Sequence, residues 1–226
     1  MLRFTWVLTL TVCVVLLLKH TIFNNGHRDI SCTDAERAFE AADFAEITRK
    51  HPSLLIGNQR ARYWNVNEAV SPDEVWFKRW VNGLNPDRIA QCFPRLIAHY
   101  QPAVVVLPID TEFAVDTPTA DIFDGLQAVV DQRSEYKLDF ELWVISPLST
   151  PRFDGVHANH LAAVNDEGKR WASNDYRTHW LDFQAVIAAE SGEPDSKLFW
   201  ANGDTLSNAG YRRLTERLVA FSNGRK

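Results

Sequence analysis

Basic residues are scarce in this sequence. Its 226 residues include 24 Lys and Arg against 29 Asp and Glu, giving a formal charge of −5 and an isoelectric point near 5.8. Proteins that bind nucleic acid generally present a basic face, so this charge argues against a nucleic-acid partner. The sequence also lacks low-complexity segments and internal repeats, which excludes repeat architectures. Its 46% hydrophobic content suits one globular domain with a substantial core.

Cysteine is scarce too, with three in the chain. Cys13 lies inside an apolar run near the N-terminus. Cys32 and Cys92 could form a disulfide in an oxidising compartment, but their spacing does not establish the Cα separation that a disulfide needs. The sequence favours the simpler interpretation that Cys92 is a small residue of the core.

Charged residues are missing from one stretch near the N-terminus. Residues 4–18 form an almost unbroken apolar run between Arg3 and Lys19. The run is slightly shorter than the roughly 20 residues of a spanning helix and sits at the upper end of signal-peptide cores. No small-x-small cleavage site follows it, so an uncleaved signal-anchor is favoured over a cleaved signal peptide. We therefore expect a membrane segment at residues 1–20, a linker at 21–32 and a globular domain at 33–226.

The apolar run also sets the expected location of the protein. We expect a single pass through the inner (cytoplasmic) membrane, with contact to lipid through residues 4–18. Arg3 on one side competes with Lys19 and Arg28 on the other, so charge determines the orientation only weakly. A periplasmic, extracytoplasmic domain is favoured.

Strand and helix signals alternate along the rest of the chain. Such alternation is typical of an α/β domain with a mostly parallel sheet. A helix remains an alternative for residues 74–81, and Pro94 is expected to kink the helix that contains it. The expected strands are residues 53–56, 74–81, 103–107, 140–145 and 179–183, and the expected helices are 33–50, 86–97, 119–132, 158–172 and 207–221.

Parallel sheets form their sites at the carboxyl ends of the strands, and the loops at those ends resemble a known family. The first strand runs into Gly-Asn-Gln at residues 57–59, and Val-Asn-Gly-Leu follows at 81–84. An apolar strand occupies 103–107, and Asn-Gly-Asp-Thr-Leu-Ser-Asn-Ala-Gly-Tyr stands at 202–211. In order and spacing these blocks are similar to those of the SGNH/GDSL hydrolase superfamily. The resemblance implies a three-layer α/β/α fold with a mostly parallel, five-stranded sheet.

The family's catalytic residues are missing from these blocks. The resemblance implies a serine nucleophile, a histidine base and an aspartate that orients it, with backbone amides and an asparagine stabilising the oxyanion. The nucleophile position falls on Gln59, and the asparagine position on or near Glu112, whose carboxylate would repel an oxyanion. The aspartate position falls on Asn202 and the histidine position on Thr205, which cannot act as a base near neutral pH. Gly83, which supplies an oxyanion amide in the family, is retained.

These losses favour a catalytically inactive domain that has kept the scaffold. Such a domain would act as a cell-envelope binding or accessory protein, with a carbohydrate, a lipid or an envelope protein as partner. Arg60 and Arg62 could hold an anionic group together with helix N-terminal amides, although solvated arginines are the ordinary alternative. The pocket candidates are Asn58, Gln59, Arg60, Gly83, Glu112, Asn202 and Thr205.

An active esterase or acyltransferase with relocated catalytic residues is the alternative. Asp154-Gly-Val-His157 matches the family's Asp-Gly-x-His pattern and follows the strand expected at 140–145. With Asp110 or Glu112 nearby, His157 or His160 could form a different acid/base pair, and Ser146 and Ser149 are the nearest alternative nucleophiles. The substrates would then be acyl esters of lipids or polysaccharides.

We expect neither a metal nor a cofactor. The acidic stretch at residues 110–116 lacks the glycine turn and converging oxygens of a calcium loop, which favours a solvated loop there. His157 and His160 have a spacing that zinc could use on a helix, but no third ligand stands out.

Overall fold

The computed structural model describes residues 30–43, 51–66, 75–153 and 155–225. The apolar run at 4–18, most of the expected linker and Asp154 lie outside these ranges. Within them, no helix is long and apolar enough to cross a bilayer.

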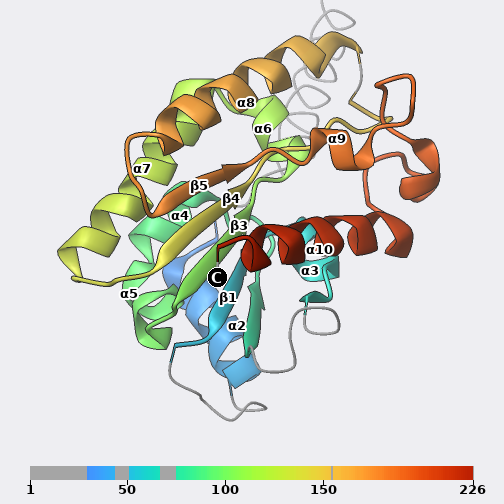
Figure 1. Cartoon of the computed structure of the whole chain (residues 1–226). Helices are drawn as coiled ribbons and strands as arrows, with labels where there is room; N and C mark the ends of the chain where they lie inside the picture. The colour runs from blue at the N-terminus through green and yellow to red at the C-terminus, as the bar shows by residue number, and fades with distance from the viewer. Residues whose placement is uncertain (1–29, 44–50, 67–74, 154, 226) are drawn as a thin grey trace, which may run out of the picture.

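A five-stranded, fully parallel sheet forms the centre of the domain, in the order β2-β1-β3-β4-β5 (Figure 1). Each of the five expected strands is present within a few residues of its expected bounds, and the described part of the segment expected at 74–81 contains the strand β2 and no helix. The strands are β1 (Ser53–Gly57), β2 (Trp76–Trp80), β3 (Val104–Pro108), β4 (Glu141–Ile145) and β5 (Thr178–Leu181).

The strand order reverses direction at β1, which pairs with β2 on one side and β3 on the other. The chain runs from β1 to β2 at the edge of the sheet and then crosses back over β1 to reach β3. The loops that follow β1 and β3 therefore lead away in opposite directions and leave a crevice between them. Open α/β sheets place their ligands at such a switch point, beyond the carboxyl ends of the strands.

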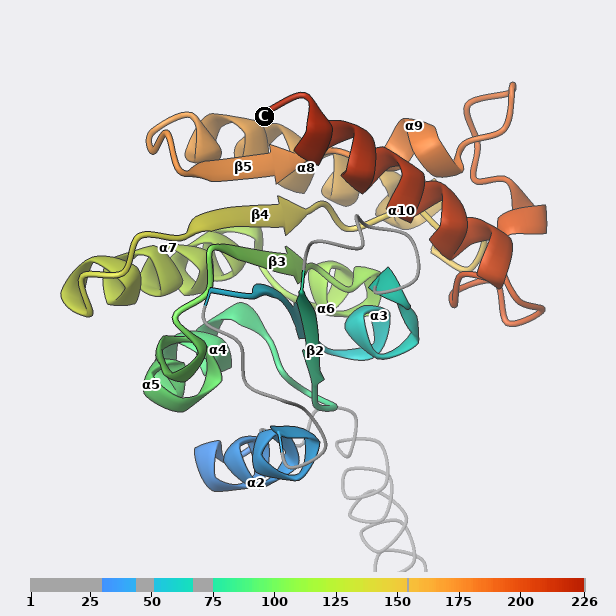
Figure 2. The same cartoon turned by 60° about the horizontal axis from the view of Figure 1, so that its bottom comes forward.

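Helices cover both faces of the sheet and give three layers (Figure 2). The layers follow from the two apolar clusters, one on each side of the sheet. One face is covered by α2 (Cys32–Asp43), α4 (Pro86–Gln91), α5 (Phe93–Leu96), α6 (Thr111–Asp116), α7 (Thr119–Glu135) and α8 (Ala158–Ala172). The other face is covered by α3 (Gln59–Tyr63), α9 (Gln184–Ile187) and α10 (Asn208–Asn223).

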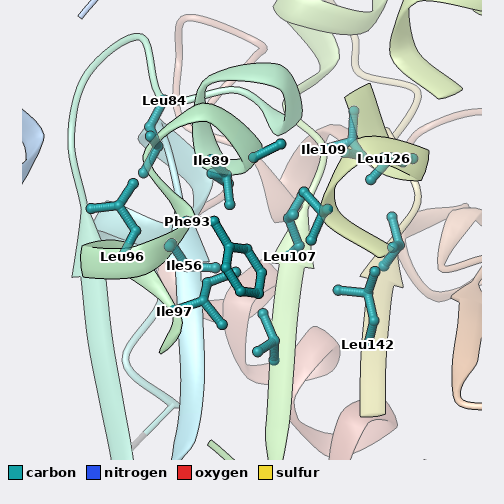
Figure 3. Close-up of a cluster of buried hydrophobic side chains, with 14 of the residues drawn as sticks. Ile56, Leu84, Ile89, Phe93, Leu96, Ile97, Leu107, Ile109, Leu126 and Leu142 are labelled. Carbon is teal, nitrogen blue, oxygen red and sulfur yellow. The ribbon is translucent and has the colours of Figure 1, made fainter. Parts of the chain in front are cut away.

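Alternation along the strands divides the apolar side chains between these two faces. Successive residues of a strand point to opposite sides of the sheet. Accordingly, Leu54 and Ile56 of β1 join one cluster, with Phe93 and Leu126 from the helices above them (Figure 3), whereas Leu55 joins the other. Burial on both sides explains why these strands are continuous apolar runs.

Pro94 breaks the expected helix instead of kinking it. α4 ends at Gln91, and α5 begins at Phe93, so that Pro94 is its second residue. Proline is accepted in the first turn of a helix because its missing N–H has no intrahelical partner there. The chain therefore restarts a helix at this point, with Cys92 at the joint.

Cys92 forms a disulfide with Cys32, so the interpretation of Cys92 as a plain core residue is wrong. The two Cα atoms lie 5.3 Å apart across a sequence separation of 60 residues. Cys32 is the first residue of α2, which packs against α5 and β2. This contact depends on how distant segments pack, which the spacing of the cysteines does not reveal.

Asp43, at the other end of α2, makes a second attachment. Its carboxylate accepts hydrogen bonds from Arg79 Nη2 at 2.5 Å, Arg95 Nη2 at 2.6 Å and the Tyr100 hydroxyl at 2.9 Å. Burial raises the pKa of Asp43, but the hydrogen bonds from Arg95, Tyr100 and Arg79 outweigh it, so the pKa lies below its ordinary value. The helix is thus fixed at both ends by strong non-local contacts.

The acidic stretch at 110–116 contains a short helix, α6, where a solvated loop was expected. Thr111 and Ala114 are buried, and His160 Nε2 of α8 lies 2.7 Å from the Ala114 carbonyl oxygen. Packing against α8 explains why a stretch with three acids folds as a helix here.

Candidate functional site

The loops after β1 and β3 meet at the switch point and are joined by the carboxylate of Asp110. Asp110 Oδ2 accepts the backbone N–H of Gln59 at 3.1 Å, and Oδ1 accepts that of Arg60 at 2.9 Å. Both amides belong to the first turn of α3, where backbone N–H groups have no intrahelical partner. Burial raises the pKa of Asp110, and the positive charge of Arg60 and these two N–H groups oppose that shift only in part.

Arg60 lies beneath this contact and is 6% exposed. Its Nη1 donates to the Ile109 carbonyl oxygen at 3.2 Å, and its Nη2 donates to Thr111 Oγ1 at 2.9 Å. The anion near Arg60 and the α3 amides is therefore Asp110 of the chain itself. The Arg60 guanidinium itself bonds neutral acceptors, and the Arg62 guanidinium lies over the Tyr63 and Trp80 rings, so an anion held by these two arginines stays a prediction.

Asn58 and Gln59 connect the same loop to the loop after β2. Asn58 Oδ1 accepts the Gly83 N–H at 3.1 Å, and Gln59 Nε2 donates to Asn82 Oδ1 at 2.9 Å. Gly83 has a φ of 80°, a conformation that favours glycine. The Gly83 amide, which the family resemblance assigns to an oxyanion, thus donates to a neighbouring side chain.

The last block forms a turn before α10. Asn202 Nδ2 donates to Thr205 Oγ1 at 2.9 Å, and Asn202 Oδ1 accepts the Thr205 N–H at 3.1 Å. Ser207 then caps α10 by accepting the Gly210 N–H at 3.3 Å. Asn202 and Thr205 are therefore paired, as the family's aspartate and histidine would be, but with an amide and a hydroxyl.

A cavity of about 280 Å³ lies where these loops meet. Five of the seven pocket candidates line it: Asn58, Gln59, Arg60, Glu112 and Thr205. The sixth, Gly83, lines an adjoining cavity of about 210 Å³ that shares Asn58 and Asp110 with the first. Asn202 supports Thr205 from outside the lining of the first cavity.

Six further residues line the 280 Å³ cavity and are not among the pocket candidates: Tyr63, Asp110, Thr111, Asp204, Leu206 and Tyr211. The carboxylate that accepts the backbone N–H of Gln59 belongs to Asp110, whereas Glu112 is exposed on α6. The sequence could have indicated Asp110, because it stands two residues beyond the end of a buried strand. It could have indicated Asp204, because this residue stands next to Thr205.

The alternative centre around His157 is positioned elsewhere in the domain. The His157 ring packs edge-on against Phe153, with centroids 5.8 Å apart, and it is not part of the 280 Å³ cavity lining. Ser146 is buried, and its Oγ accepts the Phe183 N–H at 3.2 Å. Ser149 lines a separate cavity of about 470 Å³ near α8 and α9. Asp154 lies outside the described residues, so its pairing with His157 stays a prediction.

The described part of the chain contains no group of three or more His, Cys, Asp or Glu side chains that could hold a metal ion. His160 Nε2, whose spacing from His157 alone would suit zinc, lies 2.7 Å from the Ala114 carbonyl oxygen.

Gly210 allows α10 to start close against the turn that carries Thr205. A Cβ at Gly210 would lie 2.5 Å from the Leu198 carbonyl oxygen and 2.8 Å from Leu206 Cδ2. We expect Gly210→Ala to lower the free energy of unfolding by about 1–3 kcal/mol, as overpacking usually does. Urea denaturation measures this. Gly224→Ala, where the nearest atom is the Ala220 oxygen at 3.5 Å, is the matched control and should be neutral. Equal effects of the two changes would contradict the tight contact at Gly210.

Comparison with known proteins supports the fold through structure alone. No family model matches the chain, and no curated protein matches it in sequence. Among solved structures, it is similar to a provisionally named platelet activating factor from Streptococcus pneumoniae (TM-score 0.72, 16% identity, covering 93% of this chain and 98% of that one). It is also similar to a provisionally named acylhydrolase from Bacteroides fragilis (0.68, 14%, 84% and 97%) and a GDSL-like lipase from Bacteroides thetaiotaomicron (0.66, 11%, 83% and 98%).

Identities this low show a shared fold and leave the activity open. The parallel sheet with its 2-1-3-4-5 order, the meeting of the four sequence blocks at its carboxyl edge and these structural likenesses all agree. The chain therefore has the SGNH/GDSL hydrolase-like fold, as its sequence blocks predict.

Proposed function

We propose that this protein is a membrane-anchored, catalytically inactive domain of SGNH/GDSL hydrolase-like fold that acts as a binding or accessory protein of the cell envelope. Its ligand, a group of a carbohydrate, lipid or envelope protein, would occupy the 280 Å³ cavity at the carboxyl edge of the sheet.

The observation that carries this proposal is the internal use of the two amides that would stabilise an oxyanion. The Gln59 N–H donates to Asp110, and the Gly83 N–H donates to Asn58. An oxyanion hole works because its donors are aimed, before reaction, at the place where negative charge develops. Here a carboxylate stands in front of one donor and would repel that charge.

Proton transfer lacks a suitable pair of groups as well. The amide of Gln59 cannot be activated as an alkoxide, and Thr205 cannot accept a proton near neutral pH. Its hydroxyl instead accepts a hydrogen bond from Asn202. The nucleophile and aspartate positions are thus filled by amides and the histidine position by a hydroxyl, none of which can take its family role near neutral pH.

The proposed location rests on two observations. The apolar run at residues 4–18 is suited to an anchor, and the Cys32–Cys92 disulfide suits a domain in an oxidising compartment. Both fit a domain on the periplasmic side of the inner membrane.

Ester hydrolysis tests the proposal directly. We expect the full-length protein, purified in detergent, to hydrolyse p-nitrophenyl acetate and butyrate no faster than buffer. Thr205→Ala should leave this background unchanged, because Thr205 supplies no base. The measurement is p-nitrophenolate release with a folded sample confirmed by circular dichroism. Hydrolysis above background that is lost in His157→Ala would instead support the esterase or acyltransferase with relocated residues.

A further inference from the structure

Three of the residues that line the 280 Å³ cavity are acidic: Asp110, Glu112 and Asp204. The Asp204 carboxylate also forms an ion pair with the exposed Arg152, whose Nη1 lies 3.6 Å from Asp204 Oδ2. The one guanidinium in the lining, that of Arg60, is directed at the Ile109 carbonyl and Thr111. The N–H groups of Gln59 and Arg60 are bonded to Asp110. A complementary ligand therefore brings positive charge and its own N–H donors.

The acidic side chains of the lining do not form a metal site. Over the described residues, no cluster of three or more acidic, His or Cys side chains is close enough to hold a metal ion. Metal ions require ligand oxygens within about 2.0–2.6 Å of a single centre. The positive group that suits this spacing is larger than a metal ion and carries several donors, as an ammonium group does.

Tyr211 is the second, independent sign of a ligand. Its side chain is 8% exposed and lines the cavity, and its hydroxyl makes no hydrogen bond to the described residues and is not one of their fully buried, unpartnered atoms. The hydroxyl is therefore accessible from the cavity and can bond to a ligand there. Tyr100 differs, with its hydroxyl within hydrogen-bond distance of Asp43, Arg79 and Arg95.

Electrostatic neighbours locate the Tyr211 hydroxyl within the acidic lining. Burial raises the pKa of Tyr211; the charge of Arg60 opposes the shift, and the charges of Asp110 and Asp204 add to it. Arg60, Asp110 and Asp204 line the same cavity as Tyr211. The phenol oxygen is therefore positioned to accept a hydrogen bond from a cation held by the carboxylates.

We infer that this cavity binds a primary ammonium group, held by Asp204, Glu112 and Asp110 and by the Tyr211 hydroxyl. The inference rests on the proposed binding function and specifies the chemistry of the ligand. Three sources share this chemistry: an amino sugar, an ethanolamine headgroup and a lysine side chain.

The size of the cavity agrees with a small group of a larger ligand. Its volume of about 280 Å³ lies near the lower end of ligand pockets, which span roughly 300–1,000 Å³. A groove of about 710 Å³ along α10 adjoins it, and Tyr63 and Tyr211 line both. The remainder of the ligand would continue into this groove.

The test is isothermal titration of the full-length protein in detergent with glucosamine, ethanolamine and Nα-acetyl-lysine amide. Glucose and N-acetylglucosamine are the uncharged counterparts. We expect at least one amine to bind saturably and about tenfold or more tightly than the uncharged sugars, the difference that about 1.4 kcal/mol produces. The preferred amine identifies the source of the ammonium group. Equal binding of glucose and glucosamine, or no saturable binding of any amine, overturns the inference.

Tyr211→Phe and Asp204→Asn locate the binding. Because the Tyr211 hydroxyl has no partner among the described residues, its removal should leave the melting temperature unchanged and weaken amine binding about tenfold. Asp204→Asn should weaken it similarly. Tyr176→Phe is the control, since this side chain is 77% exposed and lines a different cavity. Amine binding that survives both changes overturns the inference.

The same samples separate this inference from the proposed function. Ester hydrolysis above background contradicts the inactive accessory domain, whatever the titrations give. Absence of both hydrolysis and amine binding leaves the accessory role in place and rejects only the ammonium ligand.

Discussion

Loss of the Cys32–Cys92 disulfide is expected to lower the free energy of unfolding by about 4 kcal/mol. The bond closes a loop of 60 residues, and a cross-link of this span removes much conformational freedom from the unfolded chain. Within the loop lie α2, β1, α3, β2 and α4. The constraint therefore acts on the end of the sheet that β1 and β2 form and on the helices beside it.

The measurement is urea denaturation of the oxidised protein and of the Cys32→Ala/Cys92→Ala variant. A reducing agent should shift the denaturation midpoint of the wild type toward that of the variant and leave the variant itself unchanged. That second result is the control, because it separates the disulfide from other effects of the reagent. A difference below about 1 kcal/mol, well under the usual range for native disulfides, would contradict a bond that stabilises the folded domain.

α2 depends on this bond because its own packing is limited. Of the twelve residues of the helix, two apolar side chains are buried, Ala35 and Phe39. Burial of a large side chain contributes roughly 1.5–3 kcal/mol, which alone would hold an isolated helix only weakly. The disulfide at Cys32 and the carboxylate of Asp43 supply what the apolar face does not.

The sheet could be predicted from the sequence because its signals are local. The segment at 103–107 is β-branched and continuously apolar, as a strand buried on both faces must be, and it became β3. The helix expected at 158–172 corresponds to α8, whose apolar residues Leu161 and Val164 recur on one face. Local periodicity was enough for these elements because burial acts on each of them directly.

The site was predictable as a location and less so as chemistry. Four loops could be assigned to one edge because parallel strands bring their carboxyl ends together, and the cavity is there. The choice between Asp110 and Glu112 depended on where α6 begins. Since α6 starts at Thr111, Asp110 stays at the strand end facing α3, and Glu112 is carried onto an exposed helical turn.

Tyr211 illustrates a different gap. It lies on the buried face of α10 together with Leu214 and Leu218. The sequence pattern describes the ring, which packs as a core residue does. It does not describe the hydroxyl, whose lack of a partner among the described residues emerges only from the three-dimensional surroundings.

Replacing the Asp43 carboxylate is the other change with a large expected effect. We expect Asp43→Ala to lower the free energy of unfolding by about 3–5 kcal/mol at pH 7, the usual cost of removing one partner of a buried ion pair. The guanidinium of Arg79 is 2% exposed and would lose the carboxylate that faces it. The Tyr100 hydroxyl and Arg95 would lose the same acceptor. Urea denaturation measures the effect. Glu40→Gln, an exposed change on the same helix, is the control and should stay within about 0.5 kcal/mol.

The pH dependence of this effect has a definite sign. Because the pKa of Asp43 in the folded protein lies below its ordinary value, its contribution is complete above about pH 4, the ordinary range for aspartate. It is lost as the pH falls through the lowered pKa, where the carboxylate becomes protonated. The difference in stability between wild type and Asp43→Ala should therefore be constant from pH 5 to 7 and shrink toward pH 3. A difference that grew on acidification would show that the carboxylate is not stabilised by its cationic neighbours.

Asp43 and the disulfide hold opposite ends of the same helix, so their effects should not add. Once the disulfide is absent, α2 can detach locally from the rest of the domain. The contacts of Asp43 are then already lost in the detached state, so Asp43→Ala lowers the free energy of unfolding by less. We expect the triple variant, Asp43→Ala with Cys32→Ala and Cys92→Ala, to lose about 0.5–3 kcal/mol less than the sum of the separate losses, the range found for coupled residues. Strict additivity in denaturation would mean that the two contacts stabilise independent parts of the domain.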